Sequence, residues 1–255
     1  GNLEIKRENN IWTHDFIELD LDKEILSSVR FINQNLLPED KDVEVLLWSG
    51  LCNPDERALE YLEKICLPNL NGGDPIFDSN YPSYTSLAPF ARNIGKYWQY
   101  YTSSSNDYIY TKGWTENHGN MKKLIDHYKH TESPRRILPL NAYFHFYIGD
   151  RQVGLDGLKE ALDYCMNTRI APMFASDYVS VAKDFTELRQ FFLQDRSYLI
   201  LHNGSLRTLR IDNSHPSGFP DLSRSKGVLG YLSYQNSLYI HLDESTVQQI
   251  YLQDT

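Results

Sequence analysis

The sequence has few cysteines, no long apolar run and no cluster of basic residues. Its three cysteines, Cys52, Cys66 and Cys165, form no CxxC pair, which argues against a zinc knuckle or a disulfide framework. No stretch approaches the roughly 20 apolar residues of a membrane-spanning helix. The net charge of -9 and the absence of a basic run disfavour nucleic-acid binding, because phosphate neutralisation needs a clustered basic face. We therefore expect neither a membrane span nor a nucleic-acid partner.

The overall composition is that of a folded chain that is rich in tyrosine. Hydrophobic residues make up 41% of the 255 residues and charged residues 23%, which is enough apolar material for a core. Aromatic residues reach 13%, and 18 of them are tyrosines. Tyrosine combines a flat apolar face with a polar edge, so it suits stacking on sugar rings as well as core or interface packing.

The first three quarters of the chain alternate strand-like and helix-like patterns. This alternation predicts parallel βα units, and hence an α/β layer or barrel. Asn53-Pro54 reads as a helix start, and the stretch 69–101, rich in Gly, Pro, Asn and Tyr, reads as a long functional loop. The predicted helices are 20–35, a segment after 54, 120–130, 155–166 and 177–192; the predicted strands are 43–48, 108–111, 138–147 and 170–175.

The hydrophobic period changes to two from Ser197 onward. Strands are predicted at 198–202, 206–211, 228–234 and 238–242, and Asn203-Gly204 is a hairpin turn signal. We therefore expect two domains, residues 1–193 and residues 194–255, the second being a small antiparallel β module.

Three segments carry candidate functional residues. Two of them lie where a predicted helix begins or a predicted strand ends, and the third lies within a predicted strand. His14 directly precedes the first predicted helix, Trp48 ends a predicted strand, and His145 lies within the aromatic run 142–149. A histidine among aromatic residues suits general acid or base chemistry, but it also suits a core position bonded to a backbone carbonyl. His127 and His130 lie three residues apart on a predicted helix, where a metal pair or a solvated face are the alternatives.

Several segments together resemble the NodB-type polysaccharide deacetylases, and in particular the deacetylase region of exopolysaccharide assembly proteins. The order of the segments is more specific than any one of them, and the resemblance covers roughly residues 5–185. The segments are Asn10-Ile11-Trp12-Thr13-His14, the helix at 24–33, Leu46-Leu47-Trp48-Ser49-Gly50, Asn69-Leu70-Asn71-Gly72-Gly73-Asp74, Ser133-Pro134-Arg135-Arg136 and Tyr143-Phe144-His145-Phe146-Tyr147.

The resemblance implies an α/β fold, a NodB-like distorted (β/α)7 barrel, that removes N-acetyl groups from an amino-sugar exopolysaccharide. In that family an Asp and two His of a His-Ser/Thr-x-x-His motif hold a divalent metal, and imidazole and carboxylate are ligands that suit zinc. His14 matches the second His of this motif, and Asn10 stands at the position of the first. His145 matches the catalytic acid, and Trp48 occupies a segment that lines the sugar site. Asp74 lies in a family-typical loop and is a substrate-binding candidate on that ground. The position of Trp114 resembles a cleft-lining loop, where stacking on sugar or packing under the loop are the alternatives.

Two departures from the family pattern leave a second interpretation open. An amide at Asn10 is a weaker zinc ligand than imidazole, and the early strand that carries the family's metal and base Asp has no counterpart, so we expect a barrel that lacks its first strand or strands. The chain is then either an enzyme completed by a preceding segment, or a non-catalytic polysaccharide-binding or assembly module. The resemblance further implies a location outside the cytoplasm and other exopolysaccharide assembly proteins as partners.

Overall fold

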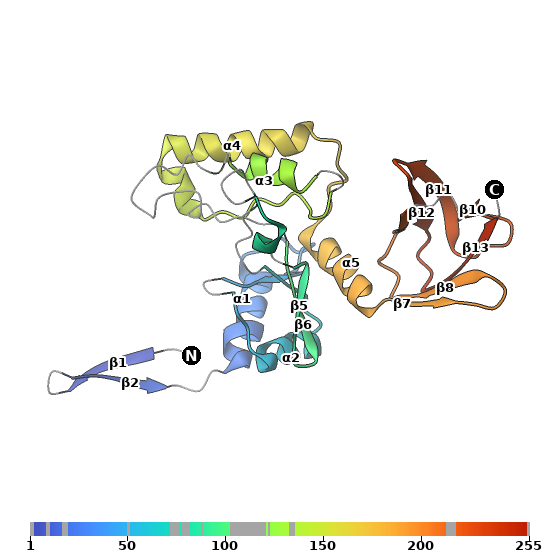
Figure 1. The fold of residues 1–255 in the computed structure, drawn as a ribbon. Helices are drawn as coiled ribbons and strands as arrows, with labels where there is room; N and C mark the ends of the chain where they lie inside the picture. The colour runs from blue at the N-terminus through green and yellow to red at the C-terminus, as the bar shows by residue number, and fades with distance from the viewer. Residues whose placement is uncertain are drawn as a thin grey trace.

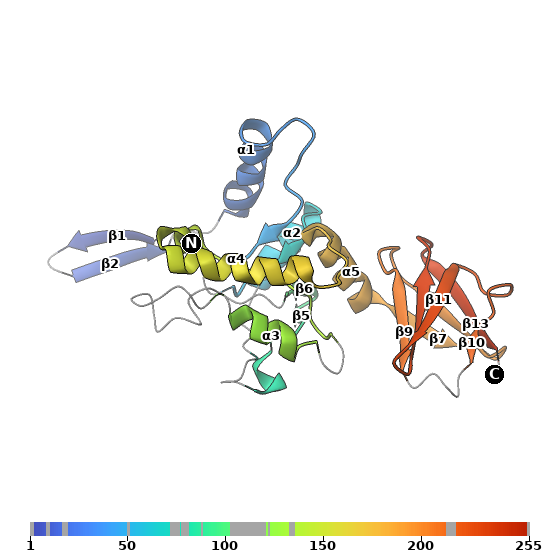
Figure 2. The same ribbon diagram turned by 90° about the horizontal axis from the view of Figure 1, so that it is seen from above.

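The computed structural model describes residues 3–8, 11–16, 20–49, 52–71, 77, 82–87, 89–102, 121, 123–132, 136–212 and 218–253. Figures 1 and 2 show three parts along the chain: an N-terminal hairpin, a mixed helical part and a C-terminal β module. The hairpin pairs β1 (Leu3–Glu8) with β2 (Ile11–Phe16) in antiparallel register. Both views place it at the opposite end of the molecule from the β module.

A βαβ unit lies in the first section of the helical part, after two helical segments. β3 (Leu46–Leu47) and β4 (Asn69–Leu70) pair in parallel, and α2 (Glu56–Lys64) connects them. The helix begins where the side chain of its N-cap, Asp55, accepts the backbone N–H of Ala58, which satisfies one of the unpaired donors of the first turn. η1 (Asp22–Leu26) and α1 (Ser27–Asn35) precede this unit and confirm the helix predicted at 20–35.

The predicted loop at 69–101 contains a hairpin as well as the end of the βαβ unit. β5 (Ala91–Ile94) and β6 (Tyr97–Tyr100) pair in antiparallel register. Gly95 begins the turn between them with a φ of 60°, a conformation that glycine adopts without strain. A short 3₁₀ turn, η2 (Tyr84–Ser86), lies upstream. The described residues of this stretch are therefore less irregular than its composition predicts.

The second helical section packs around α4 (Gln152–Asn167), which confirms the helix predicted at 155–166. α3 (Leu124–His130) and the 3₁₀ turn η5 (Phe146–Asp150) lie against it. They share one apolar core in which every member is at least nine-tenths buried: Met121, Leu124, Tyr128, Ile148, Leu158 and Ala161.

Two strands that the sequence predicted in this section are absent from the described residues. Residues 137–145 have no regular structure and lead into η5, and residues 169–174 form a connection before α5 (Ala175–Glu187). Leu140 and Ala142 of the first segment pack, partly buried, against the helical core instead, whereas Phe144 and Phe146 are exposed. An apolar run becomes a strand only where a neighbouring strand is present to take its hydrogen bonds.

The C-terminal module consists of two antiparallel sheets. One sheet has the order β10-β13-β8-β7 and the other β11-β12-β9, and their shared core includes Ile200, Leu238, Ile240, Leu242 and Ile250. The strands are β7 (Arg189–Phe192), β8 (Ser197–Leu201), β9 (Thr208–Asp212), β10 (Phe219–Pro220), β11 (Val228–Tyr234), β12 (Ser237–Leu242) and β13 (Val247–Gln253).

The period-two prediction for this module is confirmed, with two corrections. β7 pairs with β8, so the module begins at Arg189, whereas the sequence had given 189–192 to the preceding helix and placed the boundary after residue 193. Asn203-Gly204 is not a hairpin turn, because β8 and β9 belong to different sheets. The segment crosses between the sheets, and the carboxylate of Asp184 organises it.

The described strands form no closed barrel. The (β/α)7 barrel therefore stays a prediction, and the β3–α2–β4 unit is its one parallel element among the described residues. None of the described helices combines the length and the apolar character needed to cross a bilayer.

Candidate functional site

Polar side chains converge where the parallel strands β3 and β4 end. The indole Nε1 of Trp48, directly after β3, donates to Oδ1 of Asn69 at 3.0 Å. Nδ2 of Asn71, directly after β4, donates to the backbone oxygen of Trp48 at 2.8 Å. Asn69 and Asn71 are both buried. The carboxyl ends of neighbouring parallel strands are where α/β folds place their ligands, so this is the first candidate site.

A buried glutamine connects this site to the β5–β6 hairpin. Nε2 of Gln99 donates to the backbone oxygens of Cys52 and Asn71 at 2.8 and 3.0 Å. Its Oε1 accepts from the Arg92 guanidinium at 2.8 Å, and the same guanidinium nitrogen donates to Asn53 at 2.7 Å. Gln99 thus fixes the loop after β3, the loop after β4 and Arg92 in one arrangement.

The backbone at this site adopts conformations that are uncommon for residues with a side chain. Cys52 and Asn71 have φ values of 46° and 84°, which lie in the left-handed region that most side chains avoid. Each loop is held by the hydrogen bond that its backbone oxygen accepts from Gln99. Such conformations persist where surrounding contacts determine them, and they occur often at functional sites.

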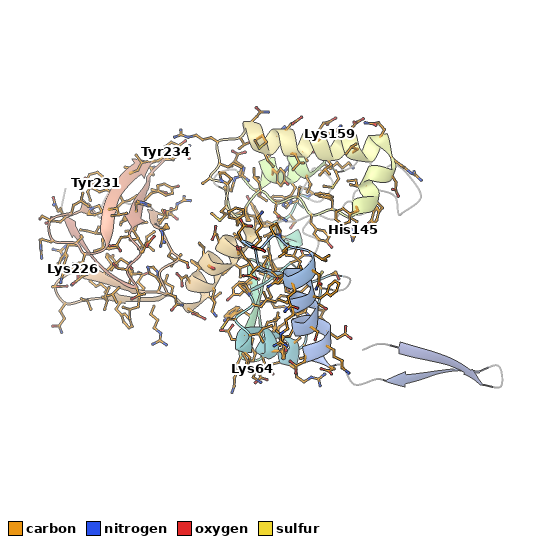
Figure 3. All side chains as sticks on the ribbon, turned by 180° about the vertical axis from the view of Figure 1, so that it is seen from behind. Lys64, His145, Lys159, Lys226, Tyr231 and Tyr234 are labelled. Carbon is orange, nitrogen blue, oxygen red and sulfur yellow. The ribbon has the colours of Figure 1, made fainter. Side chains whose placement is uncertain are left out.

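A second group of candidate residues surrounds His145 (Figure 3). The imidazole stacks on the Tyr147 ring, with centroids 4.8 Å apart and planes 12° apart, and meets the Tyr143 ring edge-on at 5.4 Å. His145 Nδ1 and the Tyr147 hydroxyl lie 2.8 Å apart, in hydrogen-bonding distance. All three rings are half-buried, so the group combines an ionisable imidazole with aromatic surface that solvent reaches.

The structure brings only some of the predicted site residues together. Trp48 joins the segment 69–71, as described above, and His145 joins Tyr143 and Tyr147. His14 lies on β2, opposite Ile5 of β1, and Figures 1 and 3 show this hairpin extending away from the part that carries α4 and His145. The structure thus does not bring the strand of His14 to His145. Asn10, Asp74 and Trp114 lie outside the described residues.

The implied metal finds no complete ligand set in the part of the chain that the structure describes. There, no three side chains of His, Cys, Asp or Glu are arranged to hold an ion. His127 and His130 do not form a solvated face, because His127 is fully buried in α3. His130 Nδ1 lies 2.7 Å from the backbone oxygen of Asp126. The divalent ion, with zinc as its predicted identity, therefore stays a prediction from the resemblance.

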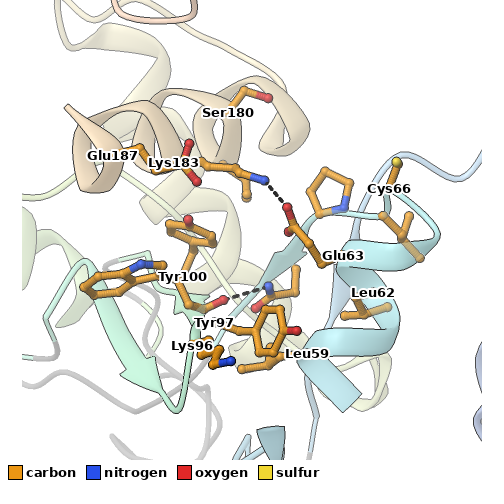
Figure 4. A pocket seen from close by; sticks show the side chains of 15 residues that line it. Leu59, Leu62, Glu63, Cys66, Lys96, Tyr97, Tyr100, Ser180, Lys183 and Glu187 are labelled. Carbon is orange, nitrogen blue, oxygen red and sulfur yellow. Dashed lines mark hydrogen bonds and ion pairs between the residues drawn. The ribbon is translucent and has the colours of Figure 1, made fainter. Parts of the chain in front are cut away.

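A cavity of about 320 Å³ lies between α2, β6 and α5 (Figure 4). Leu59, Leu62 and Val179 contribute apolar lining, and the ammonium of Lys183 lies 2.6 Å from the carboxylate of Glu63. Leu67 and Pro68, which precede β4, also line the cavity. Asn69, which accepts from the Trp48 indole, lines it as well, so the cavity adjoins the first candidate site.

Sequence reasoning identified Trp48 and the segment 69–71 but missed Gln99 and Arg92. Both lie in the Tyr-rich stretch that was interpreted as a loop. A polar residue within an otherwise aromatic run, Tyr97-Trp98-Gln99-Tyr100, is the signal that was available, because a buried amide in a strand needs specific partners. Its partners come from segments 28 and 47 residues away, which the local pattern does not specify.

Comparisons with known proteins add no further assignment: no family model, no curated protein and no solved structure gives a significant match to this chain.

Proposed function

We propose that the chain takes part in the de-N-acetylation of an amino-sugar exopolysaccharide. The observation that carries the proposal is the arrangement of His145, a half-buried imidazole held between Tyr143 and Tyr147 with its Nδ1 within hydrogen-bonding distance of a phenol hydroxyl. The order of family-like segments described above supports the same reaction. The proposal includes a divalent ion as the cofactor and a cellular location outside the cytoplasm. It also includes other exopolysaccharide assembly proteins as partners.

His145 supplies the proton that amide hydrolysis requires at the leaving nitrogen. A phenol donates to a neutral imidazole nitrogen, so the Tyr147 hydroxyl on Nδ1 selects the tautomer that carries its proton on Nε2. In the protonated imidazole both nitrogens are donors, and the Tyr147 oxygen then accepts from Nδ1. In each state Tyr147 orients the ring, and Nε2 is the nitrogen that exchanges a proton with the amine of the sugar.

The site at the ends of β3 and β4 provides the second part of the proposal, a surface for the sugar chain. Trp48 is half-buried, and its indole is fixed by Asn69. A ring held in one orientation stacks on a pyranose with little further loss of conformational entropy. Arg92 and Gln99 hold the adjoining loops, so these residues position the surface and do not perform the chemistry.

The experiment is acetate release from a partly acetylated poly-N-acetylglucosamine, with Zn²⁺ supplied or chelated. We expect the wild-type chain to release acetate with Zn²⁺ and to stop on chelation. His145→Gln should lower the rate by about 100-fold or more. His130→Gln, a histidine of α3 outside both candidate groups, is the matched control and should keep the wild-type rate.

Two results would contradict the proposal. One is the absence of acetate release by a folded wild-type chain supplied with metal. The other is a His145→Gln variant that is as active as the His130→Gln control. Tyr147→Phe refines the test: loss of the hydroxyl should reduce kcat more than KM, because the hydroxyl orients the acid and is not a substrate contact.

The second candidate function is a polysaccharide-binding or assembly module without turnover. The aromatic surface of Tyr143, His145 and Tyr147 favours it, because half-exposed stacked rings bind sugar whether or not a proton is transferred. This function predicts retention of the chain on the acetylated polymer with no acetate release. Failure to bind any amino-sugar polymer would exclude both functions.

A further inference from the structure

One face of the three-stranded sheet β11-β12-β9 carries polar and aromatic side chains in register. Residues paired across strands lie on the same face, and alternate residues lie on opposite faces. Leu232 pairs with Tyr239, which pairs with Arg210, and the next row on the same face is Tyr234, Ser237 and Asp212. The opposite face is formed by rows such as Tyr231, Ile240 and Leu209, and it includes the buried core residues Leu238 and Ile240. The first face, which we call the outer face, therefore points away from the core.

The polar groups of the outer face are held in place by one another. The guanidinium of Arg210 lies 5.4 Å from the centre of the Tyr239 ring and donates from Nε to Asp212 at 2.8 Å. The Ser237 hydroxyl donates to Asp212 at 2.9 Å and accepts from Arg210 at 3.1 Å. An aromatic ring, a guanidinium and a carboxylate are thus fixed side by side across the two strands β9 and β12.

Two large side chains at the edge of this face lie in solvent. Leu232 is 63% exposed and Tyr234 is 57% exposed, and Figure 3 labels Tyr234 on β11. The Tyr234 hydroxyl accepts from the amide of Gln235 at 3.2 Å. Exposed apolar surface beside fixed polar groups is typical of a binding surface.

We propose that the outer face binds a strand of the same polysaccharide, with Tyr239 and Tyr234 stacking on its sugar rings. A pyranose has apolar C–H faces and a rim of hydroxyls, which match an aromatic ring next to fixed donors and acceptors. Charge points the same way: Asp212 neutralises Arg210, so the pair suits an uncharged acetylated polymer rather than a phosphate backbone. The inference rests on the proposed function for the identity of the glycan. It adds the outer face as a second place where the chain contacts the polymer.

The experiment measures binding of the full chain to insoluble chitin, with cellulose as the non-amino polymer. Tyr239→Ala and Tyr234→Ala should each raise the apparent Kd for chitin by about tenfold, which is 1.4 kcal/mol. Tyr251→Ala is the matched control, because Tyr251 of β13 also lies beside a guanidinium, that of Arg224 at 4.3 Å, but on the other sheet. It should bind chitin as the wild type does. Tyr234 is exposed, so its substitution tests the face even if Tyr239→Ala unfolds the sheet.

Acetate release from a short acetylated trisaccharide separates this inference from the proposed function. Tyr234 and His145 lie in different parts of the molecule (Figure 3), so the outer-face variants should hydrolyse this short substrate at the wild-type rate. The wild-type chain and the variants could all fail to release acetate while Tyr234→Ala still weakens chitin binding. In that case the proposed function is contradicted, and the inference that the outer face binds the polymer is supported. Wild-type chain that binds no chitin, or Tyr234→Ala and Tyr251→Ala variants with equal affinity, would overturn the inference.

Discussion

Asp184 joins α5 to the crossing segment of the β module. Its side chain is 1% exposed, and it accepts the backbone N–H groups of Asn203 at 2.9 Å and Leu206 at 3.0 Å, together with that of Ser205. His202 Nδ1 lies 3.2 Å from the same carboxylate. A buried carboxylate is stable only when such donors replace water, so one residue fixes the path of the chain between the two sheets.

Replacing Asp184 with asparagine should destabilise the protein by about 2 to 4 kcal/mol, because an amide offers one acceptor oxygen in place of two and turns N–H donors toward backbone N–H groups. The measurement is the free energy of unfolding in urea. Asp177→Asn, on the exposed side of the same helix, is the control and should change it by less than about 1 kcal/mol. Equal effects of the two substitutions would show that the buried network contributes little.

The same carboxylate predicts how stability depends on pH. Burial acts to raise the pKa of Asp184, but the N–H donors of Ser205, Leu206 and Asn203 outweigh burial and hold the pKa below its usual value. A lowered folded-state pKa gives stability that is fully present above the unfolded pKa of about 3.9 and is lost as pH falls through the folded value. Urea midpoints measured from pH 7 to pH 3 should therefore fall less steeply in Asp184→Asn than in the wild type. Parallel curves would contradict this assignment.

At the scale of elements, α5 contacts both the βαβ unit and the β module, the latter through the hydrogen bonds of Asp184. Its Val179 and Ala182 pack against Leu70 of β4 and Tyr100 of β6, and the hydroxyl of Tyr178 donates to the backbone oxygen of Tyr101 at 2.7 Å. Burial raises the pKa of Tyr178 to about 12, as expected for a phenol removed from water. The helix therefore fixes the position of the βαβ unit relative to the β module that follows it.

The start of α2 offers a test of how the βαβ unit is stabilised. Asp55 caps this helix through the N–H of Ala58 at 2.9 Å, so Asp55→Ala should lower the free energy of unfolding by about 1 kcal/mol. Asp55→Ser keeps a capping oxygen and should retain most of the stability. If the serine variant loses as much as the alanine variant, the contribution of Asp55 comes from its exposed contact with Arg57 and not from the cap.

At the scale of the whole molecule, the contacts of α5 predict that the helical part and the β module unfold together. All four tryptophans, Trp12, Trp48, Trp98 and Trp114, precede residue 189, so tryptophan fluorescence reports only on the part before the module. The urea transition measured by tryptophan fluorescence should coincide with the transition measured by far-ultraviolet circular dichroism, which reports on both parts. In Asp184→Asn the fluorescence midpoint should fall with the dichroism midpoint. Two separate transitions in the wild type would show that the parts are energetically independent.

The sequence by itself determined the elements whose pattern is local. The helices near 20–35 and 155–166 and the strands of the C-terminal module follow from hydrophobic periods of about 3.6 and 2, because each residue's environment there repeats along the chain. Trp48 and the segment 69–71 were also identified from the sequence. The roles of His145 and Trp48 stay predictions, although their neighbours are now known.

Tertiary structure decided everything that depends on a distant partner. The apolar segment around residues 138–147 is not a strand, because Leu140 and Ala142 pack against helices and no described strand pairs with the segment. Asn203-Gly204 is not a hairpin, because Asp184, nearly 20 residues earlier, takes the N–H groups of that segment. Gln99 bonds to loops 28 and 47 residues away. Such hydrogen bonds form only after the chain has folded, so no local pattern specifies them.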